Sequence, residues 1–167
     1  MLTARTVATV ATLAVTFLFA QGSLAVSLIP KPGQTVSFER NYSADHLKNH
    51  PLQFTKKTSF TISNSNGMLT GRWKSTMRDP STDEAVESEA SSLCRPARRG
   101  KLECAFGNDA GTVFLTPESS SVRIAIPAGQ GVAFSERTEE GVLPGEFLLG
   151  TDDDNNLFRL NAKKSRR

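Results

Sequence analysis

Cys94-Arg-Pro-Ala-Arg-Arg-Gly-Lys-Leu-Glu-Cys104 holds both cysteines of the chain and has the pattern of a β-hairpin. With Cys94 opposite Cys104, the charges of Arg95 and Glu103 face each other across the two strands. A three-residue loop is then left at the tip, and its last residue, Gly100, suits the left-handed backbone that such loops favour. A disulfide bond needs Cα atoms roughly 4.4–6.8 Å apart, which directly opposed antiparallel residues satisfy. We predict this bond; two unpaired buried cysteines are the alternative.

The first 25 residues have the features of a secretory signal peptide. Arg5 supplies the positive charge, Val7 to Ala20 is an apolar run, and Gly22-Ser23-Leu24-Ala25 ends in small residues spaced for cleavage. The run is shorter than the 20 or so residues of a membrane-spanning helix, although an uncleaved anchor is the alternative. We therefore predict a periplasmic or secreted protein whose mature chain begins near Val26, in a compartment that favours disulfide bonds.

The remaining chain is predicted to form one domain. The whole sequence of 167 residues carries a formal charge of +3, and removal of Arg5 with the signal peptide lowers it to +2. We expect a single domain over residues 26–163 and a basic tail over residues 164–167. No aromatic residues lie among the charges of this tail, so the sequence does not support nucleic-acid binding. The mature protein is not predicted to span a membrane.

Hydrophobic residues alternate with polar ones along most of the domain. In the clearest example, Leu69, Trp73 and Met77 share one face of a strand, and Arg72 and Lys74 share the other. Strands are predicted over residues 36–42, 54–62, 69–78, 86–94, 112–116, 122–126, 132–134, 147–149 and 156–160, with turn residues between them. The fold class is therefore mainly β: a single antiparallel β-sandwich or partly closed β-barrel, with one short helix near residues 44–49.

The short helix carries the two histidines of the chain. Ser43 is its predicted N-cap and Pro51 ends it. His46 and His50 have the i, i+4 spacing of a helical metal pair, to which Asp45 adds a carboxylate. Because Pro51 disfavours helical geometry at the preceding residue, the two rings need not share a face. The more ordinary interpretation is a helix that packs across one mouth of the β domain.

A second weak metal candidate precedes the last predicted strand. Asp152, Asp154 and Asn156 have the spacing that opens a calcium-binding loop. Leu157 stands where such a loop requires glycine, and Lys163 stands where it requires glutamate. We expect a solvated loop, and no cofactor is predicted.

Three motifs together resemble a group of small exported alpha-proteobacterial proteins of uncharacterised function. They are residues 42–53, residues 102–111 with Cys104 and Asp109, and residues 150–160 with the run Phe158-Arg159-Leu160. The resemblance covers most of residues 36–163 and implies export and a β fold, but no catalytic residues. The group has a further cysteine before an Asp-Gly-Gly-like turn; here Asn108 holds that place and Ala110 replaces a glycine, which implies a reduced set of disulfide bonds.

The residues of the chain favour binding over catalysis. The sequence contains no nucleophile motif and no glycine-rich phosphate loop, so we do not expect an enzyme. Arg98, Arg99 and Lys101 at the hairpin tip form a possible binding surface on a cross-linked support. We predict a non-catalytic binding or interaction protein of the cell envelope, with an unknown macromolecule or envelope component as its partner. A calycin-like carrier of a small ligand and a His/Asp metal-binding protein are the alternatives.

The aromatic residues decide between a filled and a hollow interior. Small barrels either fill with side chains or hold a ligand. Nine aromatic residues are predicted to fill the core: Phe38, Phe54, Phe60, Trp73, Phe106, Phe114, Phe134, Phe147 and Phe158.

Overall fold

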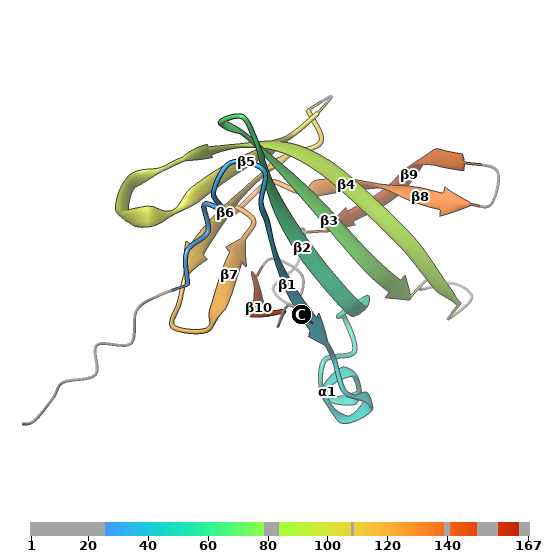
Figure 1. Cartoon of the computed structure of the whole chain (residues 1–167). Coiled ribbons are helices and arrows are strands. Elements are labelled where there is room, and N and C mark those ends of the chain that lie inside the picture. Colours follow the sequence, from blue (N-terminus) through green and yellow to red (C-terminus); the bar gives the residue numbers. More distant parts are fainter. Residues whose placement is uncertain (1–25, 79–83, 108, 139–140, 150–156, 164–167) are drawn as a thin grey trace, which may run out of the picture.

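The computed structural model describes residues 26–78, 84–107, 109–138, 141–149 and 157–163. The predicted signal peptide, the basic tail and the segment with Asp152 and Asp154 lie outside these residues. The elements are β1 (Thr35–Asn41), α1 (Ala44–Asn49), β2 (Thr55–Ser65), β3 (Met68–Arg78), β4 (Ala85–Pro96), the 3₁₀ turn η1 (Arg98–Gly100), β5 (Leu102–Phe106), β6 (Thr112–Pro117), β7 (Ser121–Ala125), β8 (Val132–Thr138), β9 (Gly141–Leu149) and β10 (Leu157–Ala162) (Figure 1).

Eight of the strands form a closed antiparallel barrel. Around the ring their order is β1, β2, β3, β4, β5, β6, β7 and β10, and β10 pairs again with β1. The predicted mainly β, antiparallel fold is confirmed. Of the two predicted architectures, the structure has the barrel and not the sandwich. Closure removes the free strand edges that an open sheet would expose.

The hairpin of β8 and β9 branches from the barrel at β4 (Figure 1). This branch is possible because β4 is 12 residues long, more than twice the length of the five-residue β5. Residues 92–96 of β4 pair with β5, whereas Ser88 and Glu89 pair with β8. Both β5 and β8 therefore pair with the same edge of β4.

The hairpin of β2 and β3 shows how local sequence sets the register. Its two-residue loop is Asn66-Gly67, and both residues have the positive φ values, 52° and 92°, of the turn that matches strand twist. On β3 the residues from Leu69 to Met77 alternate between buried positions and half-buried or exposed ones. The predicted core face of this strand is confirmed.

Trp73 lies at the centre of the core and is fully buried. Its ring lies 5.2–6.3 Å, between centroids, from the rings of Phe60, Phe106, Phe134 and Phe158. The pairs with Phe60, Phe134 and Phe158 are edge-to-face, an arrangement that stabilises a core beyond the area that it buries. In the described part of the chain these aromatic side chains occupy the barrel interior.

Two of the predicted core aromatics are placed differently. Phe114 is 36% exposed and lies on the outer face of the barrel, because its register partners Glu103 and Ala125 also face outward. Phe54 is only half-buried, since it precedes β2. The side chain of Phe147 lies outside the described residues.

The helix α1 occurs where the sequence predicts it, beyond the end of β1 (Figure 1). Ser43 caps it by accepting a 3.2 Å hydrogen bond from the backbone N–H of His46. Leu47 is half-buried, and none of the six helical residues is fully buried. Within the described ranges, no helix has the length and apolar character needed to cross a membrane.

Candidate functional site

The cysteine hairpin is formed by β4 and β5 with the predicted register. Cys94 and Cys104 are bonded, and their Cα atoms lie 4.0 Å apart, slightly closer than expected. Nη2 of Arg95 donates a 2.7 Å hydrogen bond to the carboxylate of Glu103, which raises the pKa of Arg95 above its ordinary value. The disulfide bond and the cross-strand ion pair are both confirmed.

The tip of this hairpin is tighter than predicted. Gly100 has the expected left-handed backbone, with φ of 70°, but Arg99 also adopts it, with φ of 60°. A non-glycine residue in this region carries a strain of about 1 kcal/mol. A 2.8 Å hydrogen bond from the backbone N–H of Ala97 to the carbonyl of Lys101 closes the loop. The conformation places two consecutive arginines at the turn.

The tip carries positive charge without an internal counterion. Arg98 and Arg99 are exposed and Lys101 is half-buried. Among the residues that the structure describes, no acidic side chain forms an ion pair with any of the three. We name these three residues the tip cluster. Its charges are therefore available to an external partner.

The rings of His46 and His50 share a face, although His50 is the C-cap of α1 and has the non-helical backbone (φ −127°, ψ 71°) that Pro51 predicts. The rings of His46 and His50 stack with centroids 4.3 Å apart, because α1 keeps its helical hydrogen bond from the His50 N–H to the His46 carbonyl. Nε2 of His46 lies 2.9 Å from Oε1 of Gln53. The lone pair of an imidazole nitrogen lies in the plane of its ring. Because the two rings are stacked, these lone pairs run side by side and do not converge on one metal position. No group of three possible metal ligands occurs in the described part of the chain.

The stack continues onto β1. Tyr42 packs against His46 with ring centroids 5.0 Å apart, and the guanidinium carbon of Arg40 lies 4.7 Å above the Tyr42 ring. Burial raises the pKa of Tyr42 above its ordinary value. The result is a column of one arginine and three rings that fixes the direction of the Arg40 side chain.

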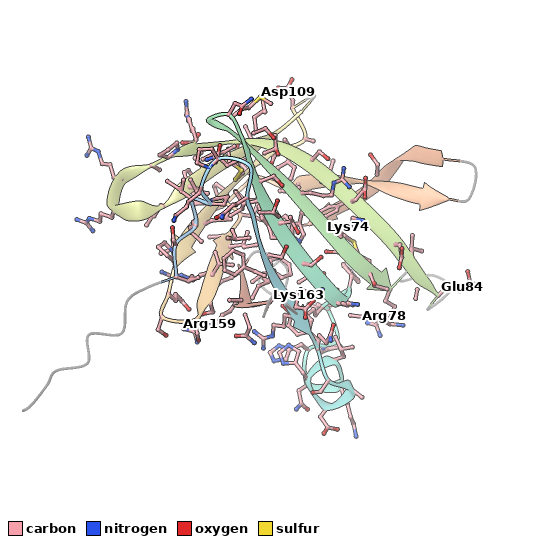
Figure 2. The ribbon with its side chains drawn as sticks, in the orientation of Figure 1. Lys74, Arg78, Glu84, Asp109, Arg159 and Lys163 are labelled. Carbon is pink, nitrogen blue, oxygen red and sulfur yellow. A yellow bond between two sulfur atoms is a disulfide. The ribbon has the colours of Figure 1, made fainter. Side chains whose placement is uncertain are left out.

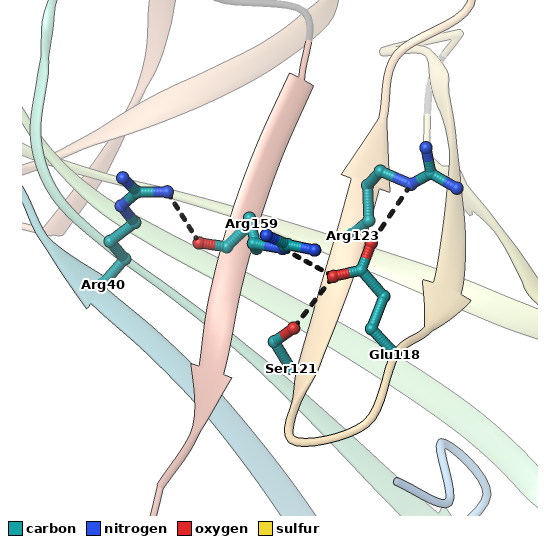
Figure 3. Close-up of polar contacts among 5 residues, drawn as sticks. All are labelled: Arg40, Glu118, Ser121, Arg123 and Arg159. Carbon is teal, nitrogen blue, oxygen red and sulfur yellow. Dashed lines mark hydrogen bonds and ion pairs between the residues drawn. The ribbon is translucent and has the colours of Figure 1, made fainter. Parts of the chain in front are cut away.

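A second basic cluster surrounds Glu118 (Figure 3). Its carboxylate accepts a 2.6 Å hydrogen bond from Nε of Arg159, lies 3.6 Å from Nε of Arg123, and accepts a 2.9 Å hydrogen bond from the hydroxyl of Ser121. The hydrogen bond from Arg159 is the main reason that the pKa of Glu118 lies below its ordinary value. Nη1 of Arg40 lies 3.3 Å from the carbonyl oxygen of Arg159.

Sequence reasoning missed this second cluster. Arg40 and Arg159 are 119 positions apart, and no motif joins them to Glu118. The signal that could have found the cluster is the strand register, because Arg159 of β10 pairs directly with Arg123 of β7. That register is known only after the barrel closes.

The interior holds polar groups as well as aromatic ones. At the end of the barrel where β2 begins and β3 ends, Thr58, Ser75 and Ser88 are buried. Thr58 and Ser75 lie 2.8 Å apart between hydroxyl oxygens, whereas the hydroxyl oxygens of Thr55 and Ser88 have no hydrogen-bond partner among the described residues. Unpaired buried hydroxyls of this kind destabilise a fold unless a water or ligand reaches them.

Comparison of the chain with models of known protein families, with curated proteins and with solved structures gives no match. The resemblance to small exported alpha-proteobacterial proteins therefore stays a prediction. The geometry of the molecule carries the functional argument.

Proposed function

We propose that this protein is a non-catalytic binding protein of the cell envelope that contacts an acidic macromolecule through the tip cluster. The observation that carries the proposal is the absence of an acidic partner for Arg98, Arg99 and Lys101 among the described residues. The planar guanidinium group of an arginine suits carboxylate groups, with which it forms two parallel hydrogen bonds.

The support beneath the tip favours binding. The disulfide bond lies four residues before Arg98 and three residues after Lys101 in the sequence, and the Arg95–Glu103 ion pair lies between the bond and the tip. A loop held in this way loses little conformational entropy when a partner binds. The same loop without a cross-link would have to be ordered during binding.

Export supports the same proposal. Residues 1–25 have the pattern of a signal peptide, and a disulfide bond is stable in the periplasm or outside the cell. A partner in that compartment is an acidic protein or another envelope component.

Affinity capture from envelope extracts tests this proposal. The bait is the mature chain, residues 26–167, and the test variant carries Arg98→Glu and Arg99→Glu. A matched variant carries Lys31→Glu and Lys48→Glu, because both lysines are exposed and the change in charge is equal. We expect an acidic component that the wild type and the matched variant retain and the tip variant loses. Equal retention by all three proteins would contradict the role of the tip cluster.

A calycin-like carrier of a small ligand is the second candidate. The closed eight-stranded antiparallel barrel favours it, since barrels of this size have room for side chains or for one small ligand. The aromatic cluster around Trp73 is the reason to prefer surface binding. Native mass spectrometry of the protein purified from periplasm without chelators separates the two: a bound small molecule would favour the carrier.

A further inference from the structure

The seam where the barrel closes is incomplete. β1 and β10 share two register pairs, Phe38 with Ala162 and Glu39 with Asn161, and one further hydrogen bond of 2.8 Å joins Lys163 to Ser37. By contrast, β10 shares five register pairs with β7 on its other side. Toward the end of β1 the backbone ladder stops, and the side chain of Arg40 reaches the carbonyl of Arg159 in its place. The strands thus close one part of the seam, and the Arg40 side chain bridges the part where their ladder has stopped.

A groove of about 780 Å³ follows this incomplete seam. We name it the seam groove, and its lining residues are Glu39, Arg40, Asn41, Arg159, Asn161, Ala162 and Lys163. Figure 2 shows the basic side chains of Arg159 and Lys163 at this part of the barrel. Its lining residues come from β1, from β10 and from Lys163 just beyond β10, so the groove runs along two neighbouring strands and suits an extended ligand.

The seam groove and its border carry an excess of positive charge. The cations are Arg40, Arg123, Arg159 and Lys163, and the anions are Glu118 and Glu39, which lies 3.2 Å from Lys163. Four cations less two anions leave a charge of +2. The side chains of Arg159 and Lys163 are 64% and 59% exposed, so both are accessible to a ligand.

The arginines are held in place but retain most of their donors. Glu118 contacts Nε of Arg159 and Nε of Arg123, and Arg40 is fixed by the Tyr42 ring and by the Arg159 carbonyl. A guanidinium has five N–H donors, and these contacts employ only a minority of them. The remaining donors are preorganised for an anion.

We propose that the seam groove binds an extended acidic polysaccharide. Carboxylate groups of its sugar units pair with Arg40, Arg159 and Lys163, and the side-chain amides of Asn41 and Asn161 bond to its hydroxyl groups. The amides beside the cations favour a sugar polymer over a lipid headgroup, which presents phosphate without a row of hydroxyls. This second binding site is separate from the tip cluster and does not depend on the proposal made for it.

The test measures binding of fluorescently labelled polygalacturonate to the mature chain by fluorescence anisotropy. Neutral dextran serves as the polymer control, and each titration is repeated at about 0.02 M and about 0.15 M salt because ion pairing weakens with ionic strength. The variant Arg40→Gln/Arg159→Gln should bind at least about tenfold more weakly than the wild type, since two charge-assisted contacts are lost. The matched variant Lys31→Gln/Lys48→Gln removes the same charge from exposed positions outside the seam groove and the tip cluster, and it should retain affinity within about twofold.

Three results would overturn the proposal: no binding of polygalacturonate by the wild type, an equal loss in both double variants, or seam-dependent binding that is tighter to phosphatidylglycerol vesicles than to the polysaccharide. If Arg40→Gln/Arg159→Gln fails to fold by circular dichroism, the pair Asn161→Asp/Lys163→Gln replaces it, with the same expected loss. The variant Arg40→Gln/Arg159→Gln also separates the two proposals, because it should lose the polysaccharide and still capture the envelope component that depends on the tip cluster.

Discussion

The indole Nε1 of Trp73 donates a 2.6 Å hydrogen bond to Oγ1 of Thr58 inside the barrel. The largest aromatic side chain of the core is therefore tied to the neighbouring strand by its only polar atom. The same Thr58 oxygen lies 2.8 Å from the hydroxyl of Ser75, so three adjacent buried groups satisfy one another. Breaking this contact leaves a buried donor without a partner.

Replacement of Thr58 by valine should destabilise the protein by about 1–3 kcal/mol, because it keeps the shape of the side chain and removes the acceptor for Trp73. Urea unfolding followed by the fluorescence of this single tryptophan measures the change. The control is Thr58→Ser, which keeps the hydroxyl and should remain closer to the wild type. Equal stability of the valine variant and the wild type would contradict the assigned role of the hydrogen bond.

Replacement of Gly71 by alanine should destabilise the barrel by about 1–3 kcal/mol through overpacking. A Cβ atom at this position would lie 2.8 Å from the Phe60 ring and 3.0 Å from Sγ of Cys94, and it would also overlap the Ser92 hydroxyl. The control is Ser91→Ala on the exposed face of β4, which should change stability by less than about 0.5 kcal/mol. Thermal unfolding of the two variants checks the difference, and similar melting temperatures would refute the close packing at Gly71.

Reduction of the Cys94–Cys104 disulfide bond should lower the free energy of unfolding by about 2.5–3 kcal/mol, because the open chain gains loop entropy when it unfolds. Unfolding curves with and without reductant measure this loss, and the intact mass should rise by two hydrogens. The control is the double variant Cys94→Ala/Cys104→Ala, whose stability should not respond to reductant. A wild-type unfolding curve that is unchanged by reductant would contradict the proposal that the disulfide bond stabilises the protein.

Glu118 should make the stability of the protein depend on pH in the acid range. Its pKa in the folded state lies below the ordinary value of 4.5, so its contribution is fully present above about pH 4.5. That contribution is lost as the pH falls through the folded-state pKa and the carboxylate protonates. Glu118→Gln should thus be less stable than the wild type at neutral pH, and the difference should shrink in strong acid.

The measurement for Glu118 is the melting temperature of both proteins between about pH 2 and pH 7. The matched variant is Glu87→Gln, which removes an exposed glutamate from β4 that has no ion pair among the described residues. Its difference from the wild type should vary less across this range. Parallel curves for Glu118→Gln and the wild type at every pH would argue against the ion pairs around Glu118.

Features that depend on neighbouring residues were predictable. The register of the cysteine hairpin follows from Arg95 and Glu103, the turn at Asn66-Gly67 follows from its dipeptide, and the helix start follows from Ser43. Alternation along β3 placed Trp73 in the core. Each of these signals depends on residues that are only a few positions apart, so it can be recognised in the sequence before the fold is known.

The stacking of the two histidine rings and the exposure of Phe114 were not predicted correctly. His50 leaves helical geometry as Pro51 predicts, but its backbone N–H still bonds to the His46 carbonyl and the two rings stack. Hydrophobicity suggested that Phe114 is buried, but its register partners place it outside. For Phe114 the register of the sheet outweighs a local preference.

Strand content, turn positions, the disulfide bond and the tip cluster therefore follow from the order of the amino acids, because periodicity and turn chemistry are local properties. The closure of β10 onto β1, the gap in their ladder and the meeting of Arg40, Arg123 and Arg159 around Glu118 follow only from the folded barrel. Closure sets the register between strands that are more than a hundred residues apart, and that register decides which side chains meet at the seam groove.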